Sequence, residues 1–339
     1  MVGDHIAAEV RLVHAGQTVT RRSFIGTAAS CGAHMMFIAS GLPRSAGRFV
    51  GTANGQVVAE EPWGRLERVG EGLWALISTP LDGDRTTLCN GGIVTGTAGL
   101  MVVESFASPD GARWMAEQAR TLTGKWPSHV VLTHFHGDHT GGIAGFAREE
   151  TPRVLATTVT RNLVQHSDAL RDRDAGSLKA RMLADVAIVN PVSATKIDLG
   201  GRTVQIMPRA GHTPSDLTIQ VNDPSVVWCG DLVWNRMFPN YTDAIPSRLS
   251  RDVRALVREA GTIYVPGHGP LADSSDLERF IEVIDTVEVA ARDAFDRGIS
   301  AEQAAREFRL PDSLGEWIMF SPRYYEVALS AWERDLSNS

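Results

Sequence analysis

The chain has 339 residues, of which 43% are hydrophobic, and a formal net charge of −7 at pH 7. This length suffices for one large domain or two smaller ones, and no internal repeat indicates a solenoid. An acidic chain lacks the basic face that follows nucleic-acid phosphates, so nucleic acid is not expected as a partner. The three cysteines, Cys31, Cys89 and Cys229, lack C-x-x-C spacing. Cys89 and Cys229 are expected to be buried thiols unless the fold brings them together.

Residues 1–45 are predicted to be a twin-arginine export signal and linker. Arg21-Arg22-Ser23-Phe24 opens a mildly apolar stretch that runs to about Leu42. Paired arginines before a short apolar region are typical of this bacterial signal, and the stretch is too short to span a membrane. The alternative is an ordinary helix start with two solvated arginines. We therefore expect a periplasmic protein whose partners include the twin-arginine export machinery.

Residues 45–62 are expected to form a linker, and the predicted elements that follow come in two batches. Strands are predicted in 66–79, 90–104, 129–132 and 153–156, and then in 196–199, 203–207, 217–221, 226–228 and 262–265. Helices are predicted in 109–122, 143–148, much of 158–187 and 248–260, and in nearly all residues after 274, where a capping box begins at Ser300. Two such batches favour two β-sheets packed face to face with helices outside.

Five of the ten histidines follow predicted strands, and they are His134, His136, His139, His212 and His268. Neutral imidazole is the commonest nitrogen ligand of zinc. His134 and His136 are two residues apart in an extended loop, so their side chains point the same way and can bind one ion together. Gly137 then allows a tight turn, which directs Asp138 and His139 to a neighbouring position.

The other candidate ligands stand in distant loops, each beside a glycine or proline at the end of a predicted strand. They are His212 in Gly211-His212-Thr213-Pro214-Ser215-Asp216, Asp231 after Gly230, and His268 in Pro266-Gly267-His268-Gly269. A single His-x-His arises easily by chance, whereas His-x-His-x-Asp-His followed by three such strand ends does not. The sequence therefore predicts a metal centre. Ser215 and Asp216 are candidates for orienting His212.

These segments, with Glu104 as the acidic residue that ends an early strand, resemble the motifs of the metallo-β-lactamase-fold hydrolase superfamily over roughly residues 66–275. The resemblance implies an αββα sandwich, of the α/β (α+β) class, with metals at one edge of the paired sheets. We expect this catalytic domain over residues 60–275 and a C-terminal helical extension over residues 276–339.

The same resemblance implies a ligand set for two zinc ions per chain, with iron or manganese as alternatives. It assigns His134, His136 and His212 to the first metal, assigns Asp138, His139 and His268 to the second, and makes Asp231 a bridge between them. Oxygen-reducing diiron relatives have glutamate at the position of His136. β-Lactamases have Cys or Ser at the position of Asp231. Asp231 therefore resembles the branch of glyoxalase II and the quorum-sensing lactonases, and Cys229 is expected to be a buried thiol behind the site.

The expected reaction is hydrolysis of a small-molecule ester, thioester or lactone, in which a metal-bridging hydroxide attacks the carbonyl carbon. Asp138 and Asp231 are the expected catalytic residues. Asn235, Arg236 and Tyr241 follow Asp231 closely and are candidate substrate contacts. β-Lactam hydrolysis and a non-catalytic periplasmic metal-binding protein are the alternatives. The sequence leaves the oligomeric state open, and a dimer through the apolar C-terminal residues is one option.

Overall fold

The computed structural model describes residues 12–14, 17–19, 55–78, 84–148, 151–171 and 178–338. The twin-arginine motif and its apolar stretch lie outside these residues, so the predicted export signal is not tested. Near the N-terminus, strand β1 (Leu12–His14) pairs antiparallel with β2 (Gln17–Val19). Among the described helices, none has both the length and the apolar content needed to cross a membrane.

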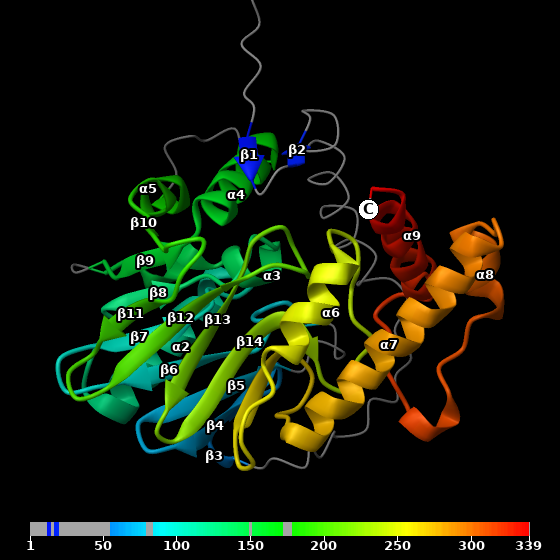
Figure 1. The fold of residues 1–339 in the computed structure, drawn as a ribbon. Helices are drawn as coiled ribbons and strands as arrows, with labels where there is room; N and C mark the ends of the chain where they lie inside the picture. The colour runs from blue at the N-terminus through cyan, green and yellow to red at the C-terminus, as the bar shows by residue number, and fades with distance from the viewer. Residues whose placement is uncertain are drawn as a thin grey trace, which may run out of the picture.

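The first sheet of the sandwich has eight strands among the described residues, in the order β10-β9-β8-β7-β6-β5-β4-β3 (Figure 1). They are β3 (Gln56–Glu61), β4 (Gly64–Gly70), β5 (Leu73–Ser78), β6 (Gly91–Thr95), β7 (Leu100–Val103), β8 (His129–Val131), β9 (Arg153–Ala156) and β10 (Ala187–Ile188). Strands β3 to β7 pair antiparallel, whereas β7 to β10 pair parallel. Parallel pairing requires crossovers, which are α2 (Pro109–Thr123), then α3 (Gly137–Thr140) with the 3₁₀ turn η2 (Ile143–Phe146), then α4 (Thr158–Arg171) with α5 (Leu178–Ala184).

The second sheet has five strands in the described chain, in the order β11-β12-β13-β14-β15. They are β11 (Thr195–Asp198), β12 (Thr203–Arg209), β13 (Asp216–Asn222), β14 (Ser225–Trp234) and β15 (Ile263–His268). Helix α6 (Pro246–Arg254) connects β14 to β15, which pair parallel. The chain ends with α7 (Ser274–Asp296), α8 (Ala301–Glu307), the 3₁₀ turn η3 (Asp312–Leu314) and α9 (Tyr324–Ser337).

Hydrophobic clusters in the described residues confirm the αββα layers. Between the sheets, Leu73 and Met101 from the first pack in one cluster with Ile219 from the second. A second cluster joins the first sheet to α2, and a third joins β14 to α6, α7 and α9. In β14, Val226 belongs to the cluster between the sheets and Val227 to the cluster under the helices, as the alternation of a strand requires. The C-terminal helices thus pack on the outer face of the second sheet (Figure 1).

Some predicted elements are wrong in part. Residues 308–323, expected to be helical, contain no helix other than the 3₁₀ turn η3. Residues 56–61, expected to belong to a linker, form the edge strand β3, and its largely exposed side chains explain why no apolar alternation reveals it. The helix predicted over 248–260 ends at Arg254. Beyond it the backbone N–H of Arg258 donates to the hydroxyl oxygen of Tyr264 (3.0 Å), and Gly261 adopts a positive φ of 90°. The hydrogen bond to Tyr264 of β15 and the turn at Gly261 therefore hold the residues after Arg254 in a non-helical path.

Helix caps agree better with the sequence. Ser300 accepts a hydrogen bond from the backbone N–H of Gln303 (3.2 Å) at the start of α8, as predicted. A capping box that the sequence analysis does not identify begins α7, where Asp273 and Asp276 each accept a bond from the other's backbone N–H. This cap lies five residues after the end of β15 and fixes the start of α7 at Ser274.

Candidate metal centre

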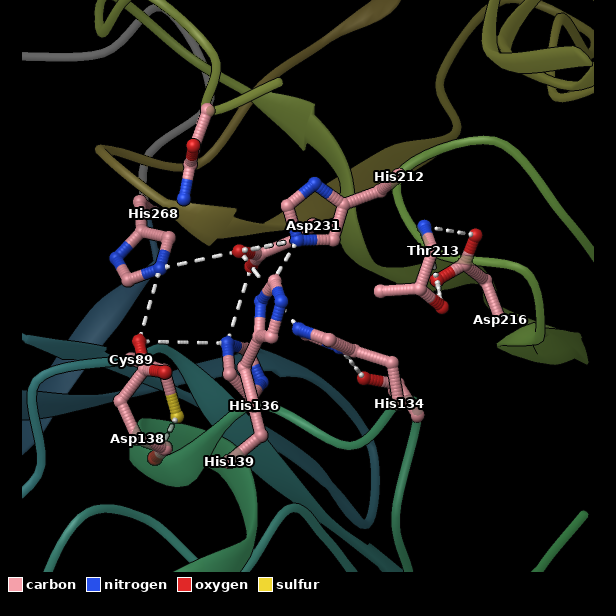
Figure 2. A network of polar contacts seen from close by, with 12 residues as sticks. Cys89, His134, His136, Asp138, His139, His212, Thr213, Asp216, Asp231 and His268 are labelled. Carbon is pink, nitrogen blue, oxygen red and sulfur yellow. Dashed lines mark hydrogen bonds and ion pairs between the residues drawn. The ribbon is translucent and has the colours of Figure 1, made fainter. Parts of the chain in front are cut away.

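The candidate ligands come together where strands of both sheets end (Figure 2). Strand β8 runs into the segment that holds His134 and His136, and α3 follows with Asp138 and His139. The turn between β12 and β13 carries His212. Strands β14 and β15 run longer than the sequence predicts, so Asp231 lies within β14 and His268 is the last residue of β15. The structure thus brings all seven predicted ligands together.

Within the described residues, three groups of side chains have ligand atoms that all lie within 4.8 Å of one another. The groups are His134 with His136, His212 and Asp231; Asp138 with His139 and His268; and Glu104 with His134 and His139. The first two match the sets that the sequence assigns to two metals. Coordination itself stays a prediction.

The carboxylate of Asp231 contacts histidines of both groups. Its Oδ2 lies 3.3 Å from Nε2 of His212 and 3.4 Å from Nε2 of His268, and its Oδ1 lies 3.1 Å from Nε2 of His139. Burial alone would raise the pKa of Asp231, but His268, His139 and His212 together lower it well below its usual value. The structure therefore favours an ionised carboxylate at the centre of the cluster.

The donor set fits a divalent cation. The Nε2 atom of His134 is buried and has no hydrogen-bond partner among the described residues. Burial lowers the pKa of His134 well below its usual value, so the ring is neutral and has a lone pair to offer. Buried polar atoms normally have partners, and imidazoles grouped around a carboxylate are typical zinc ligands. The residues therefore fit the metal ions that the sequence predicts.

Thr133 and Glu104 orient two of the imidazoles. The hydroxyl of Thr133 donates to Oε1 of Glu104 (2.5 Å) and lies 2.9 Å from Nδ1 of His134. Oε1 of Glu104 also lies 3.0 Å from Nδ1 of His139. These contacts occupy the Nδ1 side of both rings and leave Nε2 toward the cluster. Gly230 makes room for this arrangement, because a Cβ atom there would lie 2.8 Å from Oγ1 of Thr133.

Other polar side chains hold the loops that carry ligands. Asp216 accepts hydrogen bonds from the backbone N–H and the hydroxyl of Thr213, the neighbour of His212. Ser215 Oγ lies 2.6 Å from Oγ1 of Thr157. Ser215 and Asp216 therefore fix the turn rather than the ring of His212. Asn90, which the sequence analysis does not single out, donates to the carbonyl oxygens of Pro266 and Gly269 on either side of His268.

Aromatic residues from β14 and from the C-terminal segment lie against the cluster. The ring of Trp234 lies 4.1 Å from the ring of His268, and the ring of Phe320 lies 5.8 Å from it. Tyr324, the first residue of α9, is 1% exposed. Burial raises the pKa of Tyr324, and the charges of Asp138 and Asp231 raise it further, so both carboxylates act electrostatically on the phenol. No sequence motif connects these residues to the histidines.

Two of the three candidate substrate residues pair with other groups, and the hydroxyl of the third, Tyr241, has no hydrogen-bond partner among the described residues. The amide of Asn235 donates to the carbonyl oxygens of Pro270 and Leu271. Arg236 pairs with Asp276 at 3.4 Å. Tyr241 is fully buried, and the acidic groups that affect its pKa are Glu288 and Asp285. Their contact with substrate stays a prediction.

The two described cysteines are free and buried, as expected. Sγ of Cys89 donates to the carbonyl oxygen of Asp138 at 3.1 Å (Figure 2). Cys229 belongs to the cluster under the C-terminal helices, and burial raises the pKa of its thiol. Cys89 therefore lies against the cluster, whereas Cys229 packs under the C-terminal helices.

The sequence is similar to those of known proteins over most of the residues that form this site. The sequence model of the family described as the metallo-beta-lactamase superfamily matches residues 85–309. The 2,4-dinitroanisole O-demethylase subunit alpha of a Nocardioides strain is 24% identical over 216 residues, which cover 62% of this chain and 62% of that protein.

Two solved structures share the fold. The sec-alkylsulfatase Pisa1 from Pseudomonas superposes with a TM-score of 0.63 at 16% identity, over 79% of this chain and 49% of its own. A metallo-beta-lactamase from Pontibacter korlensis superposes with a TM-score of 0.53 at 18% identity, over 66% of this chain and 99% of its own. The chain thus spans about half of the alkylsulfatase and under two thirds of the O-demethylase subunit.

Proposed function

The chain belongs to the metallo-β-lactamase superfamily, and from this premise we propose that it is a hydrolase with two divalent metal ions, most simply zinc. Its proposed substrates are small-molecule esters, thioesters or lactones. The cluster at the strand ends is the proposed active site, with His134, His136, His212, Asp138, His139, Asp231 and His268 as ligands.

The position of Asp231 carries this proposal. Its two oxygens lie 3.1–3.4 Å from His139, His212 and His268, which belong to two different ligand groups. A carboxylate has two oxygens that can each face one cation, whereas Cys or Ser offers a single atom. The residue therefore suits a pair of cations held close together and favours the ester-hydrolysing branch that the sequence resembles.

The residues of the chain then have distinct tasks. Divalent cations at this cluster would supply Lewis acidity, toward water as well as toward a carbonyl oxygen. Asp138 has the most exposed side chain among the ion-paired members of the cluster, at 16%, so it can meet substrate and accept a hydrogen bond from the attacking water. Thr133 and Glu104 hold His134 and His139 in one orientation. Tyr324 supplies a hydroxyl on the side of Asp138 and Asp231.

Localisation is a separate proposal. The pair Arg21-Arg22 before an apolar stretch supports export by the twin-arginine route and a periplasmic site of action. The net charge of −7 supports a small-molecule substrate over nucleic acid. Fractionation of cells that express the chain with Arg21 and Arg22 both changed to Lys tests the route, because retention in the cytoplasm is expected. Unchanged export would contradict it.

The activity is tested by metal analysis and a substrate panel. Purified protein should contain about two ions per chain and should lose turnover when a chelator removes them. The panel contains a lactone, a thioester, an aryl ester and a β-lactam, and also 2,4-dinitroanisole and a secondary alkyl sulfate, after the names of the relatives. Faster turnover of the carbonyl esters supports the proposal, and preference for another member of the panel would overturn the substrate class. Bound metal with no turnover of any member would favour a metal-binding protein.

A further inference from the structure

Asp243 lies in the loop between β14 and α6, outside every motif that the sequence identifies. Its side chain is 2% exposed, and its Oδ2 atom lies 2.9 Å from Nε2 of His136. The other ring nitrogen of His136, Nδ1, lies 3.0 Å from Nε2 of His212. One imidazole therefore links Asp243 to the group of four side chains that can hold the first metal.

These two contacts favour one tautomer of the His136 ring. An ionised carboxylate only accepts hydrogen bonds, so Nε2 of His136 carries a proton and donates it in a hydrogen bond to Asp243. In a neutral imidazole the lone pair then belongs to Nδ1, on the side of His212. Asp243 thereby selects the tautomer of His136 that can bind a cation through Nδ1, and the hydrogen bond increases the basicity of that nitrogen.

The loop that carries Asp243 is fixed from the side of the cluster. The backbone N–H and the hydroxyl of Thr242 both donate to Oδ1 of Asn240, at 3.0 and 2.6 Å. The backbone N–H of Ile245 donates to the carbonyl oxygen of Gly211 at 2.8 Å, one residue before His212. The bonds on both sides of Asp243 therefore set its place relative to His136 and to the loop of His212.

Helix α9 holds the same loop from the opposite side. Nη2 of Arg334 donates to the carbonyl oxygen of Thr242 at 3.5 Å, and the backbone N–H of Ser247 donates to Oδ2 of Asp335 at 2.8 Å. Burial lowers the pKa of Arg334, and the charge of Asp243 opposes this shift more than Asp335 and Glu333 do, so the two side chains interact electrostatically. A neighbouring cation offsets the cost of keeping a buried carboxylate ionised.

We propose that Asp243 is a positioning residue for the metal centre and that α9 maintains its position through Arg334. The C-terminal helix would then raise metal affinity without touching a metal ion. This step rests on the two-metal function proposed above. Removing an outer carboxylate of this kind lowers metal affinity by about ten- to a hundredfold, and a neutral amide cannot replace the charge of Asp243.

The experiment measures zinc affinity of the full chain by competition with a chromophoric chelator, and the visible spectrum of the cobalt(II) form. Asp243→Asn should lower the affinity for one of the two ions by about tenfold or more and should change the cobalt spectrum. Arg334→Met should have a smaller effect in the same direction, and Arg334→Lys should restore most of the affinity. No substrate is needed for either measurement.

Asp276→Asn is the matched control. Asp276 is also a buried carboxylate, and it pairs with Arg236 and Arg279 at 3.4 and 3.5 Å. This variant should lose thermal stability but keep the zinc affinity and cobalt spectrum of the wild type. An effect on zinc affinity equal to that of Asp243→Asn would mean that any buried charge matters, and would overturn the proposal.

Further outcomes separate this proposal from the proposed function. Wild-type zinc affinity in folded Asp243→Asn would overturn the positioning role. If circular dichroism shows that Asp243→Asn does not fold, the Arg334 variants decide, since equal zinc affinity in Arg334→Met and wild type would overturn the proposal. Failure of the wild-type chain to bind zinc or cobalt would overturn the two-metal function itself.

Discussion

The ring of Phe320 lies 5.8 Å from the ring of His268 and 5.7 Å from that of Trp234. The segment before it is attached to the chain after β14, because the backbone N–H of Ile318 donates to the carbonyl oxygen of Arg236 (3.1 Å) and its own carbonyl accepts from Phe238 (2.8 Å). Residues near the C-terminus therefore form one wall of the candidate metal centre.

Phe320→Ala should weaken this wall. The residue is 7% exposed, so the truncation should lower the free energy of unfolding by about 3–5 kcal/mol. Zinc affinity should also fall, because the ring that packs on His268 is lost. Thermal unfolding and zinc titration measure the two effects. Phe295→Ala is the control, since Phe295 in α7 is 42% exposed and its truncation should change neither quantity appreciably. Unchanged zinc affinity in Phe320→Ala would show that the segment covers the site without supporting it.

Tyr324→Phe removes one hydroxyl near Asp138 and Asp231. If this hydroxyl donates a hydrogen bond to the substrate oxygen that gains charge, kcat should fall by about a hundredfold, the typical cost of removing one such donor. Metal content and stability should stay close to those of the wild type. Steady-state kinetics with the best ester of the panel provide the measurement.

Tyr241→Phe is the natural comparison. The sequence makes Tyr241 a candidate substrate contact because it follows Asp231 closely. In the structure, however, the charges that act on its hydroxyl are those of Glu288 and Asp285. Loss of turnover in Tyr241→Phe, with none in Tyr324→Phe, would support the candidate that the sequence favours and contradict the structural one.

Asp231→Asn keeps the shape of the side chain and removes its charge. The variant should bind at most one ion tightly, because an amide cannot supply two anionic oxygens to two cations. Turnover should fall by more than about a hundredfold, which is the largest loss expected when the removed group only contacts a metal ligand. Elemental analysis after gel filtration gives the ion count. Two tightly held ions in this variant would show that Asp231 does not bridge them.

The residues that gather in the cluster could be predicted because they are local features of the chain. His134, His136, Asp138 and His139 lie in one short run, and His212, Asp231 and His268 each stand beside a glycine after a predicted strand. Strand ends hold side chains rigidly, so these positions can be recognised without knowing which strands are neighbours. The apolar runs favour two packed sheets, and the family resemblance supplies the αββα arrangement of the layers.

The residues around the ligands could not be predicted, because their roles depend on contacts between distant segments. Asp243 meets His136 across 107 positions, and nothing in the residues around Asp243 indicates that contact. Phe320 reaches His268 only because the C-terminal helices pack on β14. Strand β3 escaped prediction for a different reason, since an exposed edge strand has no buried face and hence no apolar alternation.

Gly267→Ala tests how closely β15 must approach Asp231 on the neighbouring strand β14. A Cβ atom at this position would lie 1.9 Å from Oδ1 of Asp231 and 2.8 Å from the carbonyl carbon of Gly230. The backbone at 267 cannot easily withdraw, because its carbonyl oxygen accepts a hydrogen bond from Asn90 (2.8 Å). The added methyl group should therefore displace the Asp231 carboxylate. We expect a loss of about 1–3 kcal/mol in stability from overpacking and at least a tenfold loss of zinc affinity.

Gly145→Ala separates these two effects. A Cβ atom there would lie 2.0 Å from the carbonyl oxygen of Pro109, so the crowding is similar, but the contact is with the start of α2 rather than with a ligand. This control should lose stability and keep its zinc affinity, as measured by chemical denaturation and chelator competition. Equal zinc affinity in the two alanine variants would contradict the prediction, because it would mean that the Asp231 carboxylate can shift without consequence for the metal centre.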